Sequence, residues 1–340
     1  MKLVSFIESG LETAGILTTK GIISLRTAAK NFPVKAGSTM NELLSDWDKA
    51  VTLLRKIEEK ASEENSGFPF IQTDLVTLLS PVPHPPSCRD GYAFRQHVAT
   101  ARRNRGVEMI PEFDQYPVFY FTNHQAVFGG GEIILETDHF KNLDFELECA
   151  IVISKEGKNI NASEADVYIA GYMVMNELSA RVLQMEEMKL NLGPAKGKDF
   201  ATSFGPFLTT PDEIYDYKIS TPYGDKYDLP MTAYHNGELI SRGNLKDMNW
   251  TFAEIIERAS YGVMLHPGDI IGSGTVGTGC YLELNGTRAL EAKQKGESYT
   301  PVWLLEGDAI ELEIQNLGRL KNTFRKNGID YSILSKKKKS

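Results

Sequence analysis

The sequence contains little cysteine and no long hydrophobic run. Its 3 cysteines among 340 residues, Cys88, Cys149 and Cys280, lie far apart and form no CxxC pair. The odd number and wide spacing argue against a disulfide framework or a zinc site, and they fit a reducing cytoplasm. No apolar segment approaches the ~20 residues of a transmembrane helix. Because Glu8 interrupts the N-terminal apolar stretch, we expect no signal peptide.

Basic residues are not in excess either. The chain has 37 Lys and Arg residues against 45 Asp and Glu residues, for a net charge of -8. This balance argues against a nucleic-acid-binding surface spread over the whole fold, although it leaves a local cationic site open. Hydrophobic residues make up 41% of the chain, which is enough for a sizeable core.

The pattern along the chain predicts three parts. Residues 1–74 form a small N-terminal module, residues 75–330 a larger catalytic domain, and residues 331–340 a lysine-rich tail. The tail run Lys336–Lys339 is interpreted as a solvated end, with a localisation signal as the alternative.

The sequence of the N-terminal module predicts strands followed by one helix. Lys2–Ile7 and Gly21–Leu25 are β-prone and are separated by glycine-containing turns. Thr39 and Glu42 form a capping box, and an apolar stripe predicts that the helix continues to about Glu64. Nothing in this part has the appearance of a catalytic site.

The stretch from Asp90 to His97, DGYAFRQH, brings a carboxylate, a phenol and an imidazole together. We predict a helix here, because a spacing of seven residues would place Asp90 and His97 on one helical face. Such a pair suits a site in which the Asp holds a cation and the His takes a proton. The alternative is an N-capping Asp followed by an ordinary surface His.

A second candidate element is the strand predicted at Leu143–Ser154, LDFELECAIVIS. Glu146 and Glu148 are two residues apart, so both project from one face of this strand. Two adjacent carboxylates repel each other unless a cation lies between them. A solvent-exposed strand face is the alternative, whereas the apolar continuation of the run favours a central strand and a cation.

Polar residues also gather at the end of the next strand, Val167–Met175. We predict a helix after it with Asn176 as N-cap, which places Glu177, Arg181 and Gln184 on one helical face. This face offers a carboxylate, a guanidinium and an amide to a ligand. The alternative is a surface ion pair that contributes only about 0.3–0.5 kcal/mol.

The remaining chain supplies further polar groups between strands. A glycine-containing turn presents Lys198, and the hydroxyl of Thr202 follows four residues later. After Pro211 we expect a strand-rich chain to the end, with one short helix. The expected elements are a hairpin turn at Asn236-Gly237, a helix at Thr251–Ser260, a glycine-rich loop at Ile270–Cys280 that carries Thr275, and paired strands at Val302–Leu305 and Ala309–Ile314.

Taken in order, these elements resemble the fumarylacetoacetate hydrolase family. The order is D-x-Y-x-x-x-Q-H, E-x-E on a strand, N-[acid]-x-S-A-R-x-x-Q, G-K-x-F-x-T, G-T and a late L-E-L, from about Asp90 to Arg319. The resemblance implies an α+β fold, with a mixed β-roll of the fumarylacetoacetase C-terminal type behind the N-terminal module. It also implies a homodimer, and we expect a cytoplasmic protein with no membrane or nucleic-acid partner.

The resemblance implies a role for each candidate side chain. His97 would be the general base that activates water, oriented by Glu283, with Arg181, Gln184 and Lys198 as donors to the developing oxyanion. Tyr92, Tyr120, Arg181, Gln184 and Thr275 would contact a small-molecule substrate. Asp90, Glu146, Glu148 and Glu177 would hold a divalent cation, Mg²⁺ or Ca²⁺, with Lys198 and Thr202 beside a second cation site or the substrate. Glu177 departs from the family, which usually has Asp at that position.

The implied activity is metal-dependent hydrolysis of a carbon–carbon bond in a β-diketone acid. The first candidate is the conversion of 4-fumarylacetoacetate and water to fumarate and acetoacetate, in tyrosine and phenylalanine breakdown. A second is an acylpyruvase, hydratase or decarboxylase of the same superfamily acting on another 2-oxo acid. A third is a non-catalytic cation-binding protein that has kept the carboxylates.

Overall fold

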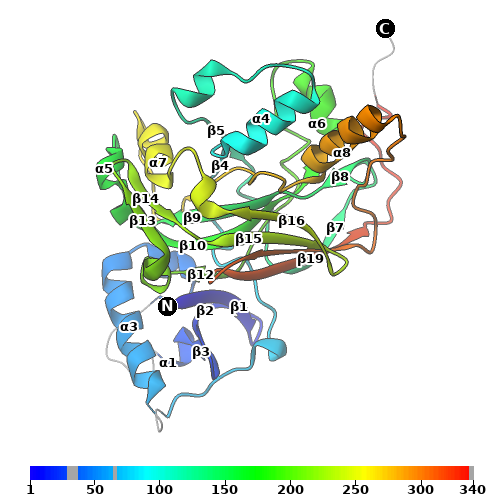
Figure 1. The fold of residues 1–340 in the computed structure, drawn as a ribbon. Coiled ribbons are helices and arrows are strands. Elements are labelled where there is room, and N and C mark those ends of the chain that lie inside the picture. The colour runs from blue at the N-terminus through cyan, green and yellow to red at the C-terminus, as the bar shows by residue number, and fades with distance from the viewer. Residues whose placement is uncertain (29–36, 64–66, 337–340) are drawn as a thin grey trace.

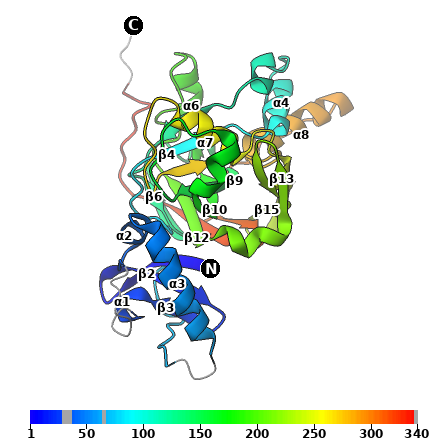
Figure 2. The ribbon, with the colours of Figure 1, turned by 90° about the vertical axis from the view of Figure 1, so that its left-hand side faces the viewer.

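Two large β-sheets, two small two-stranded ribbons and a set of helices build the described part of the molecule. The structure, a computed structural model, describes residues 1–28, 37–63 and 67–336. Its N-terminal part lies below the rest of the molecule, as Figure 1 shows in blue, and α3 lies over the N-terminal strands in Figure 2. Within the described ranges, no helix is long and apolar enough to cross a membrane.

A ten-stranded mixed sheet runs through both parts of the chain. Its strand order is β3-β2-β1-β12-β10-β9-β17-β4-β5, with β6 paired to β12. The strands are β1 Lys2–Glu8, β2 Leu11–Thr18, β3 Gly21–Ser24, β4 Cys88–Gly91, β5 Phe119–Thr122, β6 Val127–Phe128, β9 Leu147–Ile153, β10 Ile169–Glu177, β12 Thr202–Thr209 and β17 Ile270–Gly272.

A five-stranded sheet, in the order β16-β15-β18-β19-β7, packs against one face of the large sheet. Its strands are β7 Gly131–Leu135, β15 Pro230–His235, β16 Glu238–Asn244, β18 Ala309–Ile314 and β19 Gly318–Lys326. Two small ribbons pair β8 Leu143–Asp144 with β11 Ser179–Ala180, and β13 Lys218–Thr221 with β14 Gly224–Tyr227. The mixed α+β class expected from the sequence is confirmed.

The α-helices lie at the ends and faces of these sheets, and α4 packs against α8 (Figure 1). They are α1 Leu25–Ala28, α2 Met40–Leu44, α3 Trp47–Ser62, α4 Arg95–Asn104, α5 Ala162–Ala165, α6 Arg181–Met188, α7 Phe252–Ser260 and α8 Tyr281–Lys295.

Alternating side chains of β9 supply two hydrophobic cores. Leu147, Cys149 and Ile151 point into the core shared with the five-stranded sheet. Ala150 and Val152 point to the opposite face, into a core that includes residues of α2 and α3. This two-sided burial explains why the sequence of β9 is almost continuously apolar. It also makes β9 a central strand, as the sequence analysis favoured.

In the N-terminal part, the predicted capping box agrees with the structure, whereas the predicted helix and the predicted set of strands differ from it. The capping box of Thr39 and Glu42 is present. The single expected helix is two helices, because the chain breaks at Ser45 and Asp46 between α2 and α3. Strand β2 was not predicted; it joins β1 to β3 in the sheet. The tail residues 337–340, which include most of the lysine run, lie outside the described residues.

The expected helix start at Asn176 is wrong. Strand β10 continues through Asn176 and Glu177, which pair with Ser203 and Thr202 of β12. The helix begins only at Arg181, after β11. The Asn176 side chain instead accepts a hydrogen bond from the backbone N–H of Glu146 at 3.2 Å. A strand partner far along the chain therefore outweighed the local capping signal.

The C-terminal region is less strand-rich than expected. The L-E-L motif around Glu283 lies in α8, a helix of 15 residues that the sequence analysis missed. Val302–Leu305 is not a strand, and β18 pairs with β19 instead. The hairpin turn at Asn236-Gly237 is confirmed, with positive φ angles of 50° and 86°.

Candidate active site

Three neighbouring strands and a glycine position the central carboxylates. Asp90 on β4 and Ala150 on β9 both pair with Gly272 of β17, which lies between the two strands. A Cβ atom on Gly272 would lie 2.4 Å from the Asp90 carboxylate. Gly272 thus leaves the space that the Asp90 side chain occupies.

Asp90 and His97 do not share a helix, so that prediction is wrong. Asp90 is in β4, where it pairs with Tyr120 of β5, and α4 begins only at Arg95. The chain turns between the two, so tertiary pairing of β4 with β5 and β17 separates the two residues into different elements. Both are nevertheless buried.

Asp90, Glu148 and Glu177 form a compact group that we call the carboxylate triad. One oxygen of each lies within 4.8 Å of the others, and all three residues are buried. Thr275 donates a hydrogen bond to Glu148 at 3.3 Å, and Tyr120 donates one to Glu177. The triad thus draws together residues that are far apart in the sequence.

The electrostatics of the triad fit a bound cation. Burial and then the Glu177 carboxylate raise the pKa of Asp90, and burial and then Asp90 raise the pKa of Glu148. Oε2 of Glu148 is buried and has no hydrogen-bond partner among the residues that the structure describes. An oxygen-only donor set of this kind suits a hard divalent cation, which would neutralise the mutual repulsion.

Glu146 lies beside the triad and is held by two cations. It accepts hydrogen bonds from Lys198 and, at 2.8 Å, from Arg181. Burial acts to raise the pKa of Glu146, but Lys198 and Arg181 together bring it below its usual value. Lys198 also donates to Glu177 at 2.8 Å. Lys198 therefore bridges Glu146 to the triad, and metal ligation by Glu146 stays a prediction.

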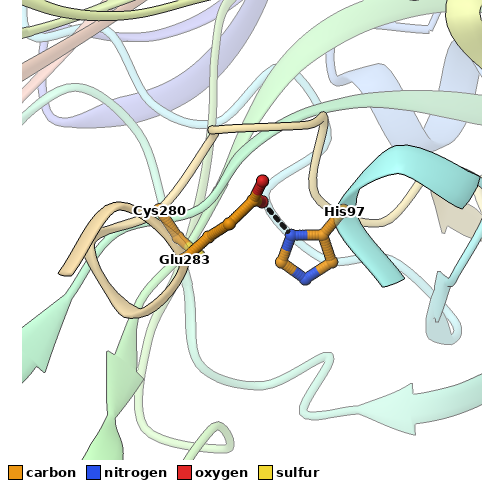
Figure 3. A group of neighbouring side chains, drawn as sticks. All are labelled: His97, Cys280 and Glu283. Atoms are coloured by element: carbon orange, nitrogen blue, oxygen red, sulfur yellow. Dashed lines mark hydrogen bonds and ion pairs between the residues drawn. The ribbon is translucent and has the colours of Figure 1, made fainter. Parts of the chain in front are cut away.

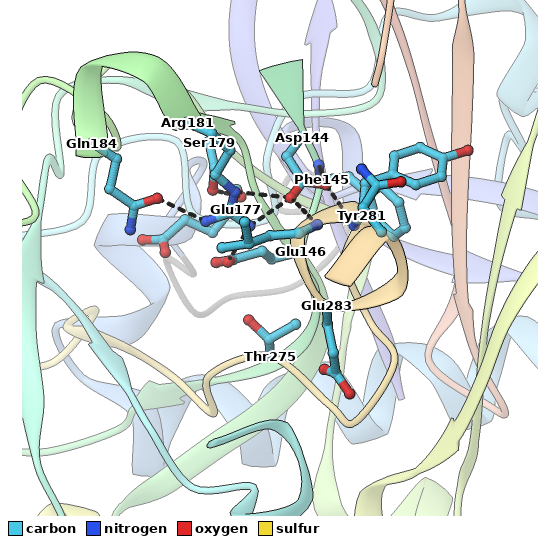
Figure 4. A network of polar contacts seen from close by, with 12 residues as sticks. Asp144, Phe145, Glu146, Glu177, Ser179, Arg181, Gln184, Thr275, Tyr281 and Glu283 are labelled. Atoms are coloured by element: carbon cyan, nitrogen blue, oxygen red, sulfur yellow. Dashed lines mark hydrogen bonds and ion pairs between the residues drawn. The ribbon is translucent and has the colours of Figure 1, made fainter. Parts of the chain in front are cut away.

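Arg181 is the hub of a second network (Figure 4). Its guanidinium donates to Gln184 at 2.9 Å, to Glu146 at 2.8 Å and to Asp144 at 2.8 Å. These contacts occupy most of its five N–H groups. Arg181 is thus positioned firmly, with little donor capacity left for a substrate.

Asp144 is the residue of this network that the sequence analysis missed. Its carboxylate is fully buried. Besides Arg181, it accepts hydrogen bonds from the backbone N–H groups of Tyr281 at 2.7 Å and Leu282 at 2.9 Å. These are the first two residues of α8, so a carboxylate from a distant strand caps that helix. Only its place two residues before the E-x-E pattern could have drawn attention to it.

His97 and Glu283 form a dyad between α4 and α8. The Nδ1 atom of His97 lies 2.6 Å from Oε2 of Glu283, and both side chains are buried (Figure 3). The Tyr92 ring meets the His97 ring edge-on at a centroid distance of 5.9 Å. The carboxylate holds one ring nitrogen, which leaves Nε2 as the atom that can exchange a proton.

The dyad and the triad belong to one site. Burial acts to raise the pKa of Glu146, whereas Lys198, Arg181 and, to a smaller extent, the nearby His97 ring lower it. Thr202 pairs in register with Glu177, which places it at the same end of the sheet. The structure therefore brings the predicted residues into one neighbourhood, although their roles stay predictions.

Comparison with known proteins identifies the family. The model of the fumarylacetoacetate hydrolase C-terminal family matches residues 87–325. The chain belongs to the fumarylacetoacetate hydrolase family. This region contains every residue of the triad and of the dyad, as well as Arg181 and Lys198.

Relatives in the family differ in their named activities. The chain is 28% identical to the rat mitochondrial oxaloacetate tautomerase Fahd2a, covering 95% of this chain and 91% of the relative. It is also 28% identical to the oxaloacetate tautomerase YisK of Bacillus subtilis, covering 90% and 94%. Bovine fumarylacetoacetase is 31% identical, but over only 65% of this chain and 63% of the relative.

Solved structures support the fold of the family. A fumarylacetoacetate hydrolase from Exiguobacterium antarcticum superposes with a TM-score of 0.67 at 22% identity, covering 96% of this chain and all (100%) of the other. A maleylpyruvate hydrolase from Sphingobium, solved with manganese(II) and pyruvate, has a TM-score of 0.66 at 20% identity, covering 96% and 99%. The fumarylacetoacetase type of fold expected from the sequence is confirmed.

Glu177→Asp tests the departure from the usual family residue. We expect this variant to keep or improve metal affinity, because it retains a carboxylate at the end of β10. Isothermal titration with Mn²⁺ and Mg²⁺ would measure the dissociation constant. Glu177→Gln is the control and should weaken binding at least ~10-fold, since it removes one charge. Unchanged binding in Glu177→Gln would show that the position is not a ligand.

Asp144→Asn tests the buried contact between Arg181 and α8. Removing the charge leaves the buried guanidinium without its partner at Asp144 and weakens the helix cap. We expect the free energy of unfolding to fall by about 3 kcal/mol, as measured by denaturant titration. Asp228→Asn, which removes an exposed ion pair with Lys246, should change the midpoint little. An unchanged midpoint in Asp144→Asn would rule out this role.

Proposed function

We propose that this protein catalyses metal-dependent enolisation of a small 2-oxo dicarboxylic acid, with the keto–enol interconversion of oxaloacetate as the first candidate. The observation that carries the proposal is the buried carboxylate triad in one neighbourhood with the His97–Glu283 dyad. Two tautomerases that match nearly the full length of the chain support this choice of substrate.

The residues of the chain supply binding and proton transfer. Asp90, Glu148 and Glu177 would hold a divalent cation, which polarises the carbonyl of a chelating 2-oxo acid as a Lewis acid. Nε2 of His97 takes a proton from the carbon next to the carbonyl, while Glu283 holds Nδ1 and stabilises the charged ring. The same ring then returns the proton to the enolate oxygen, which completes the tautomerisation without water.

Lys198 supplies positive charge where the substrate becomes anionic. Its ammonium is buried and lies between Glu146 and Glu177. Although burial acts to lower its pKa, Glu146 and then Glu177 raise it above the usual value, so Lys198 stays protonated. A fixed buried ammonium stabilises an enolate oxygen more than it would in water.

Hydrolysis of fumarylacetoacetate is the second candidate. The His97–Glu283 hydrogen bond favours it, because a dyad of this kind also activates water for attack on a carbonyl. Bovine fumarylacetoacetase, a partial match to this chain, gives further support. The hydrolytic route requires a water within reach of His97, and the tautomerase route does not.

One experiment separates the two candidates. The purified protein is stripped of metal by chelation, and Mg²⁺, Mn²⁺ or Ca²⁺ is added back before each substrate. Metal-dependent loss of the enol absorbance of oxaloacetate, with carbon–carbon bonds intact, would support the tautomerase. Equal amounts of fumarate and acetoacetate from fumarylacetoacetate would support the hydrolase and a place in tyrosine breakdown. Activity on neither substrate would overturn both candidates.

Several properties expected from the sequence belong to the same proposal. We propose Mg²⁺ as the metal in the cell, with Mn²⁺ and Ca²⁺ as competitors, because all three prefer oxygen donors. A homodimer, a cytoplasmic location and the boundaries 1–74, 75–330 and 331–340 stay predictions. Strand β1 pairs with β12, so the N-terminal module is continuous with the sheet of the catalytic domain.

A further inference from the structure

A second group of metal-binding side chains surrounds the dyad. His97, Cys280 and Glu283 each offer one ligand atom, and these atoms lie within 4.8 Å of one another (Figure 3). The three residues come from α4, from the residue that precedes α8 and from α8 itself. All three are buried, and Cys280 has no accessible surface. No local sequence pattern predicted this group, because Cys280 has no neighbouring cysteine or histidine.

One atom of the group has no partner. The Oε2 atom of Glu283 lies beside His97, but its Oε1 is buried and lacks a hydrogen-bond partner in the part of the chain that the structure describes. A buried carboxylate oxygen without a donor is costly, and a cation is one way to satisfy it. Glu283 extends from α8 toward His97, as Figure 3 shows.

We propose that His97, Cys280 and Glu283 form a zinc-binding site. Zinc bound there inhibits the enzyme by coordinating His97, its proposed general base. Nitrogen, sulfur and carboxylate oxygen are the donors that Zn²⁺ takes in proteins. Ligands of a tetrahedral zinc lie roughly 3.5 Å apart, so small side-chain rotations that widen the 2.6 Å contact between His97 and Glu283 would let the group surround one ion. Water or substrate would complete the coordination.

The chemistry of this group differs from that of the carboxylate triad, with which it shares no ligand. Asp90, Glu148 and Glu177 offer only oxygen, which suits Mg²⁺. The sulfur and nitrogen donors of the second group instead select a borderline metal such as Zn²⁺. The protein would therefore discriminate between an activating hard cation and an inhibiting borderline cation at two adjacent places.

Inhibition follows from the atoms involved. Zn²⁺ binds Nδ1 of His97 in place of the proton that this atom shares with Glu283, and the displaced proton moves to Nε2, where the neutral ring then holds it. A ring in this state cannot accept a second proton from a substrate carbon or from water. The Cys280 thiol also loses its proton to solvent when its sulfur binds, so binding releases protons and strengthens as the pH rises.

Cobalt tests binding without any assay of activity. The protein is saturated with Mg²⁺ so that the triad is filled, and Co²⁺ is then added as a spectroscopic substitute for Zn²⁺. We expect a thiolate-to-cobalt charge-transfer band in the near ultraviolet, with one equivalent bound. The band should be absent in Cys280→Ala and Cys280→Ser but present in Cys149→Ala, whose thiol lies in the hydrophobic core. Absence of the band from the unmodified protein would overturn the proposal.

Zinc inhibition provides the second readout, which rests on the proposed function. Turnover is measured with saturating Mg²⁺ and increasing Zn²⁺, and each variant is compared with its own activity without zinc. We expect the zinc concentration for half-inhibition to rise at least tenfold in Cys280→Ala and Cys280→Ser, but not in Cys149→Ala. Equal inhibition of all variants would place the effect at the triad and refute the site. Lack of turnover of both oxaloacetate and fumarylacetoacetate would refute the proposed function without affecting the cobalt result.

Discussion

We expect His97→Ala to reduce kcat by about 10²–10⁴-fold, the range in which a positioned general base contributes. In the unmodified protein, Glu283 fixes Nδ1 of the ring at 2.6 Å and leaves Nε2 for proton transfer. Alanine removes the only atom proposed to move the proton. Metal affinity should stay within about twofold, because no triad carboxylate contacts His97. Steady-state kinetics and isothermal titration with Mn²⁺ would measure both quantities.

Glu283→Gln provides the matched test of the dyad. This variant keeps the shape of the side chain and its contact with Nδ1, but it removes the charge that stabilises the protonated ring. We expect a smaller loss of kcat than in His97→Ala, with unchanged metal affinity. Near-normal turnover in His97→Ala would refute its role as the base. Lack of turnover in the unmodified protein, with cation binding retained, would instead favour a non-catalytic cation-binding protein.

Glu148→Gln should weaken metal binding by at least ~100-fold, which exceeds the 10–100-fold loss usual for outer-shell partners of a metal. Glu148 is fully buried, and its Oε2 has no donor within the described ranges. The amide is neutral and presents N–H groups where a cation requires oxygen. Titration with Mn²⁺ would measure the loss of affinity, and turnover should fall with it.

The same variant should have the opposite effect on the metal-free protein. Burial and then Glu177 raise the pKa of Asp90, and burial and then Asp90 raise the pKa of Glu148, so the crowded charges of the triad oppose folding. Removing one charge should raise the Tm of the metal-free protein and abolish the rise in Tm that Mg²⁺ gives the unmodified protein. A metal-dependent rise of normal size in Glu148→Gln would contradict the triad as the metal site.

Glu146→Gln is the informative comparison for this experiment. Glu146 already accepts hydrogen bonds from Arg181 and Lys198. If it is not a ligand, its substitution should weaken metal binding far less than Glu148→Gln. An equal loss would show that Glu146 gives up its contact with Arg181 or Lys198 and binds the metal, as the family resemblance implies.

Features that depend on neighbours in the sequence could be predicted correctly. The capping box of Thr39 and Glu42 and the hairpin turn at Asn236-Gly237 each form within a few residues. The short helix predicted at Thr251–Ser260 is present as α7, with its own capping box. Such contacts are decided by local hydrogen bonds and by backbone conformation, so the tertiary structure did not alter them.

The order of the motifs along the chain also identified the family. No single motif is specific, but six motifs in the right order point to one fold, and the match to residues 87–325 confirms this conclusion. The order identified the residue types from which the triad and the dyad are built. The sequence alone therefore determined the family, the mixed α+β class and the candidate residues.

The tertiary structure decided how those residues meet. Pairing of β4 with β17 placed Asp90 in a strand instead of a helix, and pairing of β10 with β12 kept Asn176 out of a helix cap. Asp144 became the cap of α8, and Cys280 came beside the dyad. Asp90 and Gly272, Asp144 and Tyr281, and His97 and Cys280 are each more than 100 positions apart, and Asn176 and Ser203 are 27 positions apart. The energies of these contacts depend on burial and on partners in space, which local sequence patterns do not encode.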